Sequence, residues 1–92
     1  MMQAVKLTIS GKVQKVGYRN WFESHALELG LKGYVRNLPT SQVEAIVVGD
    51  REKIQEMISR SKQGPVHADV TDIQRLELNS AEYQFEDFQI RR

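Results

Sequence analysis

Nine residues near the start of the chain, Gly11 to Arg19, have the types and spacing of an anion-binding loop, G-K-V-Q-K-V-G-Y-R. A strand-like segment precedes them and a helix-like segment follows, so the loop would present its backbone amides at the start of a helix. The first amides of a helix lack partners within it and the helix dipole is positive there, which favours a phosphate or another anion. Arg19 adds a planar guanidinium that suits phosphate oxygens. This loop is therefore the first candidate site.

The same residues also allow a plainer interpretation. Gly11 and Gly17 could form a tight turn between strand and helix, with Arg19 solvated in the first helical turn. Two known phosphate-binding motifs do not fit, because the G-K-S/T of a Walker loop and the G-x-G-x-x-G of a dinucleotide site are both absent. Taken alone, the loop leaves an anion site and a simple turn open.

The composition excludes several classes of protein and site. The 92 residues suffice for one domain, expected over residues 1–92. With 13 basic and 12 acidic residues the net charge is +1, which gives no electrostatic reason to bind nucleic acid or a membrane. The lack of cysteine excludes disulfides, thiolate zinc sites and cysteine nucleophiles. His25 and His67 have no adjacent carboxylate, so no metal site or cofactor is expected.

The N-terminus has no apolar leader, and no segment is long and apolar enough to span a membrane. We therefore expect a cytoplasmic protein, and a monomer, because no exposed apolar strip is evident.

Hydrophobic periodicity places the candidate loop within a recognisable order of elements. Alternating apolar residues predict strands at 4–13, 31–37, 42–48, 68–78 and 84–90, and apolar stripes predict helices at 19–29 and between an Asp50 cap and Gly64. Gly49 is expected to end the third strand, and a bulge near Asp72 would bring the out-of-phase Val70 and Ile73 onto one face. The order predicts an α+β, ferredoxin-like β-α-β-β-α-β fold with a short additional C-terminal strand. Two helices would lie on one face of a mostly antiparallel sheet.

Further segments match one known family. The run from Leu29 to Asn37 is L-G-L-K-G-Y-V-R-N, residues 42–44 are Q-V-E, and Gly64-Pro65 and the D-F-Q-I of residues 87–90 follow. With the first loop, they resemble the acylphosphatase family, whose pattern is approximately G-x-V-Q-G-V-x-[FY]-R, then L-G-L-x-G-x-V-x-N, then D-G-x-V-E. The matches run in order along nearly the whole chain. The resemblance implies a ferredoxin-like, metal-independent hydrolase that converts small-molecule acyl phosphates to carboxylate and inorganic phosphate.

The resemblance also implies specific roles for residues. Arg19 and Asn37 would be catalytic, Arg19 by gripping the phosphoryl oxygens and Asn37 by orienting the attacking water. A carboxamide can donate and accept hydrogen bonds at once, which suits that role. The substrate-binding cradle would consist of the backbone amides of Lys15, Val16, Gly17, Tyr18 and Arg19. The alternative for Asn37 is a strand-end residue that caps a turn with its own side chain.

Two positions depart from the family pattern. Lys15 stands where the family usually has glycine, and a lysine in a left-handed conformation costs about 1 kcal/mol. Thr40-Ser41 replace the usual Asp-Gly, so Pro39 is expected to set a longer hairpin turn.

Two alternative functions therefore remain open. The first is a non-catalytic phosphate-binding, anion-binding or interaction domain of the same fold. The second is an RNA-binding module, which the near-neutral charge and the lack of the required aromatic motif around Tyr83, Phe85 and Phe88 argue against.

Overall fold

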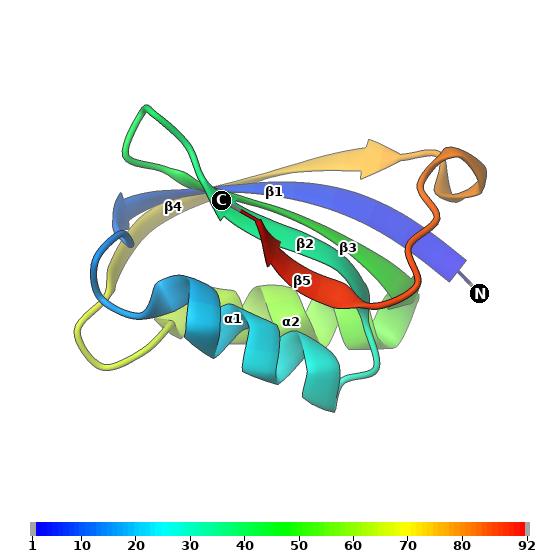
Figure 1. Cartoon of the computed structure of the whole chain (residues 1–92), viewed down its shortest axis with the longest axis horizontal. Helices are drawn as coiled ribbons and strands as arrows, with labels where there is room; N and C mark the ends of the chain where they lie inside the picture. The colour runs from blue at the N-terminus through cyan, green and yellow to red at the C-terminus, as the bar shows by residue number, and fades with distance from the viewer. Residues whose placement is uncertain (1, 92) are drawn as a thin grey trace.

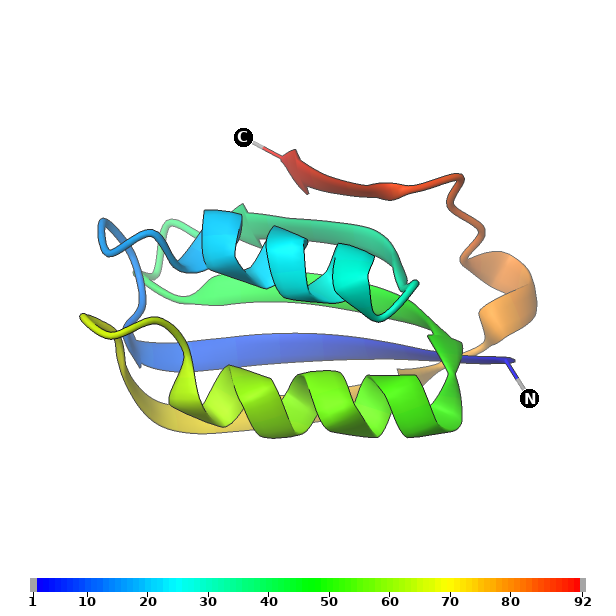
Figure 2. The same cartoon turned by 90° about the horizontal axis from the view of Figure 1, so that it is seen from below.

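A computed structural model of the protein describes residues 2–91 and contains one five-stranded sheet with two helices. The strands are β1 (Met2–Lys12), β2 (Lys32–Asn37), β3 (Val43–Asp50), β4 (Asp69–Leu78) and β5 (Phe88–Arg91). The helices are α1 (Tyr18–Glu28) and α2 (Arg51–Gln63), and a short 3₁₀ turn spans Ser80–Glu82. The strand order is β4-β1-β3-β2-β5, antiparallel throughout except for the β2–β5 pair. Both helices cover the same face of the sheet (Figures 1 and 2), so the ferredoxin-like prediction is confirmed.

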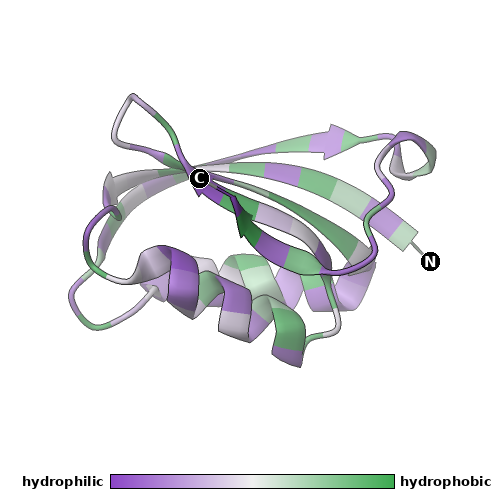
Figure 3. Ribbon diagram, in the orientation of Figure 1, coloured by the Kyte–Doolittle hydropathy of each residue, from purple (hydrophilic) through white to green (hydrophobic). Residues whose placement is uncertain are grey.

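The main core lies between the sheet and the two helices. On β1, Val5, Leu7 and Ile9 are fully buried and face the helices, as their alternation predicted. Phe22 of α1 and Ile54 of α2 pack onto them without solvent exposure. Bands of apolar and polar residues alternate along the strands in Figure 3, as expected of a sheet with one fully covered face.

The other face of the sheet has a smaller apolar cluster. It contains Ala4, Tyr34, Ile46 and Val48, with Leu78, Tyr83 and Phe85 packed against it. The segment after β4 therefore covers part of the open face on its way to the far edge of the sheet (Figure 1).

The bulge predicted near Asp72 is present. Ser10 of β1 pairs with Asp72, but the next residue, Gly11, pairs with Val70, so Thr71 is the extra residue. Gly11 has a φ of 120°, and a Cβ there would collide with the backbone oxygen of Asp69. The bulge allows Val70 and Ile73 to pack against the same core.

Three predicted strand ends were wrong by two residues or more. Strand β1 begins at Met2 instead of residue 4, because its first residues pair with the end of β3. Strand β3 continues to Asp50 instead of ending at Gly49, because both residues pair with the beginning of β1. A Cβ at Gly49 would lie 2.6 Å from Leu31 Cδ2, so this glycine allows a close packing contact and does not end the strand. Strand β5 begins at Phe88, not at residue 84, because within residues 2–91 it pairs with β2 alone and this pairing begins at Gly33 and Phe88.

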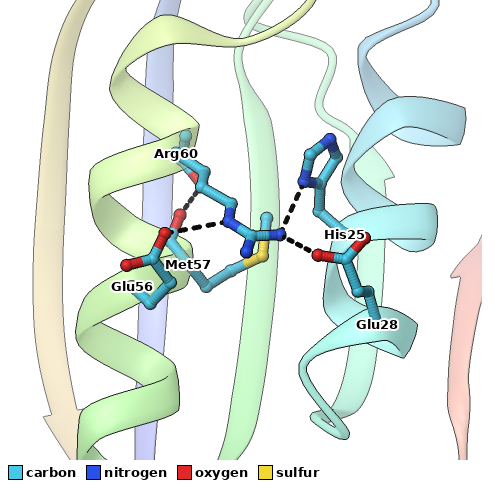
Figure 4. Close-up of polar contacts among 6 residues, drawn as sticks. His25, Glu28, Glu56, Met57 and Arg60 are labelled. Atoms are coloured by element: carbon cyan, nitrogen blue, oxygen red, sulfur yellow. Dashed lines mark hydrogen bonds and ion pairs between the residues drawn. The ribbon is translucent and has the colours of Figure 1, made fainter.

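The two helices are joined at the outer surface by Arg60 of α2 (Figure 4). Its Nε lies 2.9 Å from Glu56 Oε2, and its Nη1 lies 2.7 Å from Glu28 Oε1 on α1. The same Nη1 is 3.0 Å from His25 Nδ1, which must accept because a guanidinium can only donate. The His25 ring packs against Trp21 with the ring centroids 4.3 Å apart. His25 therefore packs at the surface between the Trp21 ring and the Arg60 guanidinium.

Candidate active site

A cavity of about 300 Å³ lies where the β1–α1 loop, the end of β2 and strand β5 meet. Among its lining residues are Lys15, Gly17, Tyr18 and Arg19 from the loop and helix start, together with Asn37 of β2 and Ile90 of β5. Val16, the remaining residue of the expected cradle, packs against the hydrophobic core. The structure thus brings both expected catalytic side chains and most of the expected cradle to one cavity.

The loop reaches the helix through left-handed backbone. Gly17 is the N-cap of α1 with φ 77° and ψ 17°, and its carbonyl accepts the first helical hydrogen bond, from Trp21 N at 3.0 Å. Lys15 has a φ of 63°, the strained conformation expected from its place at a family glycine. No acidic residue occupies the first turn of α1, so no side-chain carboxylate there competes for the helix start.

The charge of the cavity matches an anionic ligand. Within residues 2–91, the charged side chains that line the cavity are those of Lys15 and Arg19, and both are cationic. They lie beside the start of α1, where the first backbone amides have no helical partner. A phosphoryl group would therefore meet positive charge from two side chains and one helix terminus.

The side chain of Asn37 ends in an unpaired oxygen. Its Oδ1 is buried and has no hydrogen-bond partner among the described residues. Leaving a buried acceptor unpaired costs about 1–3 kcal/mol. Such acceptors are therefore rare in folded proteins unless a ligand or a water molecule pairs with them. The oxygen also makes no turn-capping bond, since the hairpin is closed by backbone bonds from Leu38 N to Gln42 O and from Ser41 N to Leu38 O.

The hairpin after Asn37 has the longer form expected from Pro39. The Leu38 N–H donates to Gln42 O at 2.8 Å, so the loop is wider than a two-residue turn. Ser41 stands where the family pattern has glycine, and its φ of 76° lies in the left-handed region that favours glycine.

Gln14 is a residue of this region that sequence reasoning missed. Its Nε2 donates to Leu38 O at 3.0 Å and to Gln42 O at 2.8 Å, and so connects the β1–α1 loop to the hairpin. These partners lie 24 and 28 residues away, and no local pattern specifies a contact over that distance.

Helix α2 is hydrogen-bonded to the first residue of α1. The buried Tyr18 hydroxyl donates to Ser61 O at 2.8 Å. In a continuous helix that carbonyl would accept from residue 65, which is Pro65 and has no N–H. Burial raises the pKa of Tyr18 strongly, with the hydrogen bond to Ser61 opposing this in part. A Cβ at Gly64 would lie 2.9 Å from the Tyr18 ring, so the glycine leaves room for it.

Two kinds of feature are absent from residues 2–91. No group of three or more His, Cys, Asp or Glu side chains in this part of the chain is placed to hold a metal ion. Neither of its helices combines the length and the apolar character needed to cross a membrane.

Comparisons with known proteins agree on one family. A family model described as Acylphosphatase matches residues 5–90. An acylphosphatase of Methanocella arvoryzae is 46% identical over 83 residues, which cover 90% of this chain and 94% of that protein. The structure of an acylphosphatase from Coxiella burnetii superposes with a TM-score of 0.92 at 32% identity, covering 98% of this chain and 93% of the other. An acylphosphatase structure from Bacillus subtilis gives a TM-score of 0.93 at 29% identity, with both chains fully covered.

Proposed function

Because the chain belongs to the acylphosphatase family and is thus a hydrolase of acid anhydrides, we propose that it hydrolyses acyl phosphates in the cavity between α1 and β2. The products are a carboxylate and inorganic phosphate. The observation that supports this site most directly is the convergence of Arg19, the start of α1 and Asn37 on one cavity.

Arg19 is the proposed phosphate-binding residue. Its guanidinium would bind two phosphoryl oxygens, and the backbone amides of residues 15–19 would close around the group. The transferring phosphoryl group spreads negative charge over its equatorial oxygens in the transition state. Donors that are already in place stabilise this charge without further reorganisation.

Asn37 is the proposed water-positioning residue. Its carboxamide, at the wall of the cavity, would bind a water molecule and hold that water in line with the bond to the leaving carboxylate. A neutral carboxamide is too weak a base to take the proton, so a substrate oxygen would receive it. Because a carboxylate is a good leaving group, the reaction does not require a metal or a covalent intermediate, and we propose that it proceeds without either.

The enzyme is further proposed to be a cytoplasmic monomer that binds no nucleic acid. The balanced charge of 13 basic and 12 acidic residues supports the last point. Size-exclusion chromatography with light scattering tests the monomer, and a mass near 10.6 kDa is expected.

The decisive experiment follows benzoyl phosphate hydrolysis by the purified protein in the presence of EDTA. We expect turnover by the wild type and a fall of about two to three orders of magnitude in kcat/KM for Arg19→Ala and for Asn37→Ala. Arg75→Ala is a matched control, because Arg75 is exposed on β4 and pairs with Glu77 away from the cavity. Circular dichroism confirms that each variant is folded.

The alternative functions give different results in the same assay. Phosphate binding without turnover by the wild type would support the non-catalytic anion-binding domain. Equal losses in Arg19→Ala and Arg75→Ala, or full activity in Asn37→Ala, would contradict the assigned roles.

A further inference from the structure

We infer that Gln14 is a positioning residue for the hydrolysis: its side-chain amide fixes the hairpin that begins at Asn37 relative to the loop that binds phosphate. The inference rests on the proposed function, since it assumes that Arg19 and Asn37 act on the same substrate. It concerns how Arg19 and Asn37, which stand on different segments, are held at a fixed position relative to each other.

The hydrogen bonds of Gln14 define its orientation. Both partners, Leu38 O and Gln42 O, are backbone carbonyls at 3.0 and 2.8 Å. A carbonyl can only accept, so the NH₂ end of the side chain must face them, and both of its hydrogens are used. The contact is partly buried, which strengthens it relative to a bond fully exposed to water.

Gln14 lies within the phosphate-binding wall of the cavity. The preceding residue, Val13, is 1% exposed and lines the cavity. The following residue, Lys15, lines the cavity as well and has the left-handed φ of 63°. Gln14 therefore stands between two residues of this wall. Its side chain extends from the wall to the hairpin on the opposite side.

The two carbonyls that Gln14 binds control the position of Asn37. Asn37 is the last residue of β2, and Leu38 follows it directly. The Leu38 N–H is bound to Gln42 O at 2.8 Å and the Leu38 carbonyl to Gln14, so both polar groups of this residue are fixed. The Asn37 Oδ1 itself has no hydrogen-bond partner among the described residues, so no hydrogen bond to that oxygen helps the backbone to hold the side chain in place.

A second tether on the same hairpin provides a control. Gln42 Nε2 donates to Ser10 Oγ at 2.8 Å and so attaches the hairpin to β1. This bond resembles the shorter Gln14 bond in length but does not reach the residues that line the cavity. If any anchor of the hairpin sufficed, loss of the Ser10 hydroxyl would have the same effect as loss of the Gln14 amide.

The first test compares Gln14→Met with Ser10→Ala and the wild type on benzoyl phosphate. Methionine keeps the approximate size of the side chain but removes both donors. A misplacement of about 1 Å in an active site can lower the rate by about 100-fold, so we expect kcat to fall at least about tenfold. The inhibition constant for inorganic phosphate should change less than about threefold, because Arg19 and the loop amides are retained. Ser10→Ala should keep kcat within about twofold.

The second test uses the pH dependence of Gln14→Glu. At neutral pH the new carboxylate has no donor and faces two carbonyl oxygens, so its activity should also fall. Protonation gives the carboxyl one O–H donor and restores one of the two bonds. The ratio of its kcat, per folded protein as measured by circular dichroism at each pH, to that of the wild type should therefore rise as the pH is lowered. A residue needed only for folding would change the folded fraction with pH and leave this ratio constant.

Several results would overturn the inference. These are an unchanged kcat in Gln14→Met, a parallel loss of kcat and phosphate affinity, an equal loss in Ser10→Ala, or a pH-independent ratio for Gln14→Glu. A wild type that binds phosphate without hydrolysing benzoyl phosphate would instead refute the proposed function. If Gln14→Met does not fold, the pH dependence of Gln14→Glu decides the inference.

Discussion

Replacing Tyr18 with phenylalanine should destabilise the protein by leaving one buried carbonyl without a partner. Ser61 O accepts its hydrogen bond from the Tyr18 hydroxyl at 2.8 Å, and Pro65 supplies no N–H to take over. Phenylalanine retains the ring and its contacts with Trp21 and Phe22, whose centroids lie 5.6 and 6.2 Å away. The variant therefore isolates the hydroxyl.

The magnitude follows from the burial of both partners. Tyr18 is 1% exposed and Ser61 is fully buried, so water cannot readily replace the lost donor. Leaving a buried acceptor unsatisfied costs about 1–3 kcal/mol, and we expect the free energy of unfolding to fall by about 2 kcal/mol. For a domain of this size each kcal/mol lowers Tm by about 4–8 °C, so a decrease of about 8–16 °C is expected.

The pH dependence provides a second signature of the same hydroxyl. Burial raises the pKa of Tyr18 above its ordinary value near 10. Above that pH the unfolded wild type loses a proton that the folded state retains, so wild-type stability declines as the pH rises. The phenylalanine variant lacks this group, and the difference in stability should narrow above about pH 10.

Urea titration followed by circular dichroism measures the effect, with Ser61→Ala as the control. The Ser61 hydroxyl donates to Met57 O at 2.7 Å, but that carbonyl already accepts a helical N–H, so the control should change the free energy of unfolding by less than about 1 kcal/mol. A Tyr18→Phe variant as stable as the wild type, or a control that loses as much, would refute the reasoning. Turnover should be preserved in the folded variant, because the backbone amide of residue 18 is retained.

Two further predictions concern backbone strain and surface charge. Lys15→Gly should raise the free energy of unfolding by up to about 1 kcal/mol, because glycine adopts a φ of 63° without the steric cost; an unchanged or lower urea midpoint would contradict this. Arg60 lowers the pKa of Glu28 by hydrogen bonding and by its charge, so this carboxylate stabilises the fold above its ordinary pKa. The wild type should therefore exceed Glu28→Gln in Tm at neutral pH, and the gap should close as the pH falls through the lowered pKa; a gap that is constant with pH would exclude this ion pair as the cause.

Much of the fold could be predicted because it is encoded by local patterns. Alternation in β1 identified the residues that face the helices, and the phase change between Val70 and Ile73 located the bulge. The left-handed backbone at Lys15 followed from its place at a family glycine. These features depend on side-chain periodicity and backbone sterics, which act over a few residues.

What could not be predicted depends on contacts between distant segments. The late start of β5 is set by where β2 offers pairing, and the extension of β3 to Asp50 is set by the first residues of β1. The bridge from Gln14 to the hairpin joins segments that meet only in the folded chain. A glutamine in a loop has the same local appearance whether it is solvated or holds two carbonyls.

The position of β1 between β3 and β4 has a consequence for the order in which the chain becomes protected during synthesis. Strand β1 is synthesised before the other four strands of the sheet, and it pairs Ala4 with Val48 on one side and with Leu78 on the other. One edge of β1 can therefore be closed once β3 has been synthesised, while the other edge stays unpaired until β4 emerges. Aggregation between nascent chains and recognition by chaperones should be concentrated in that interval.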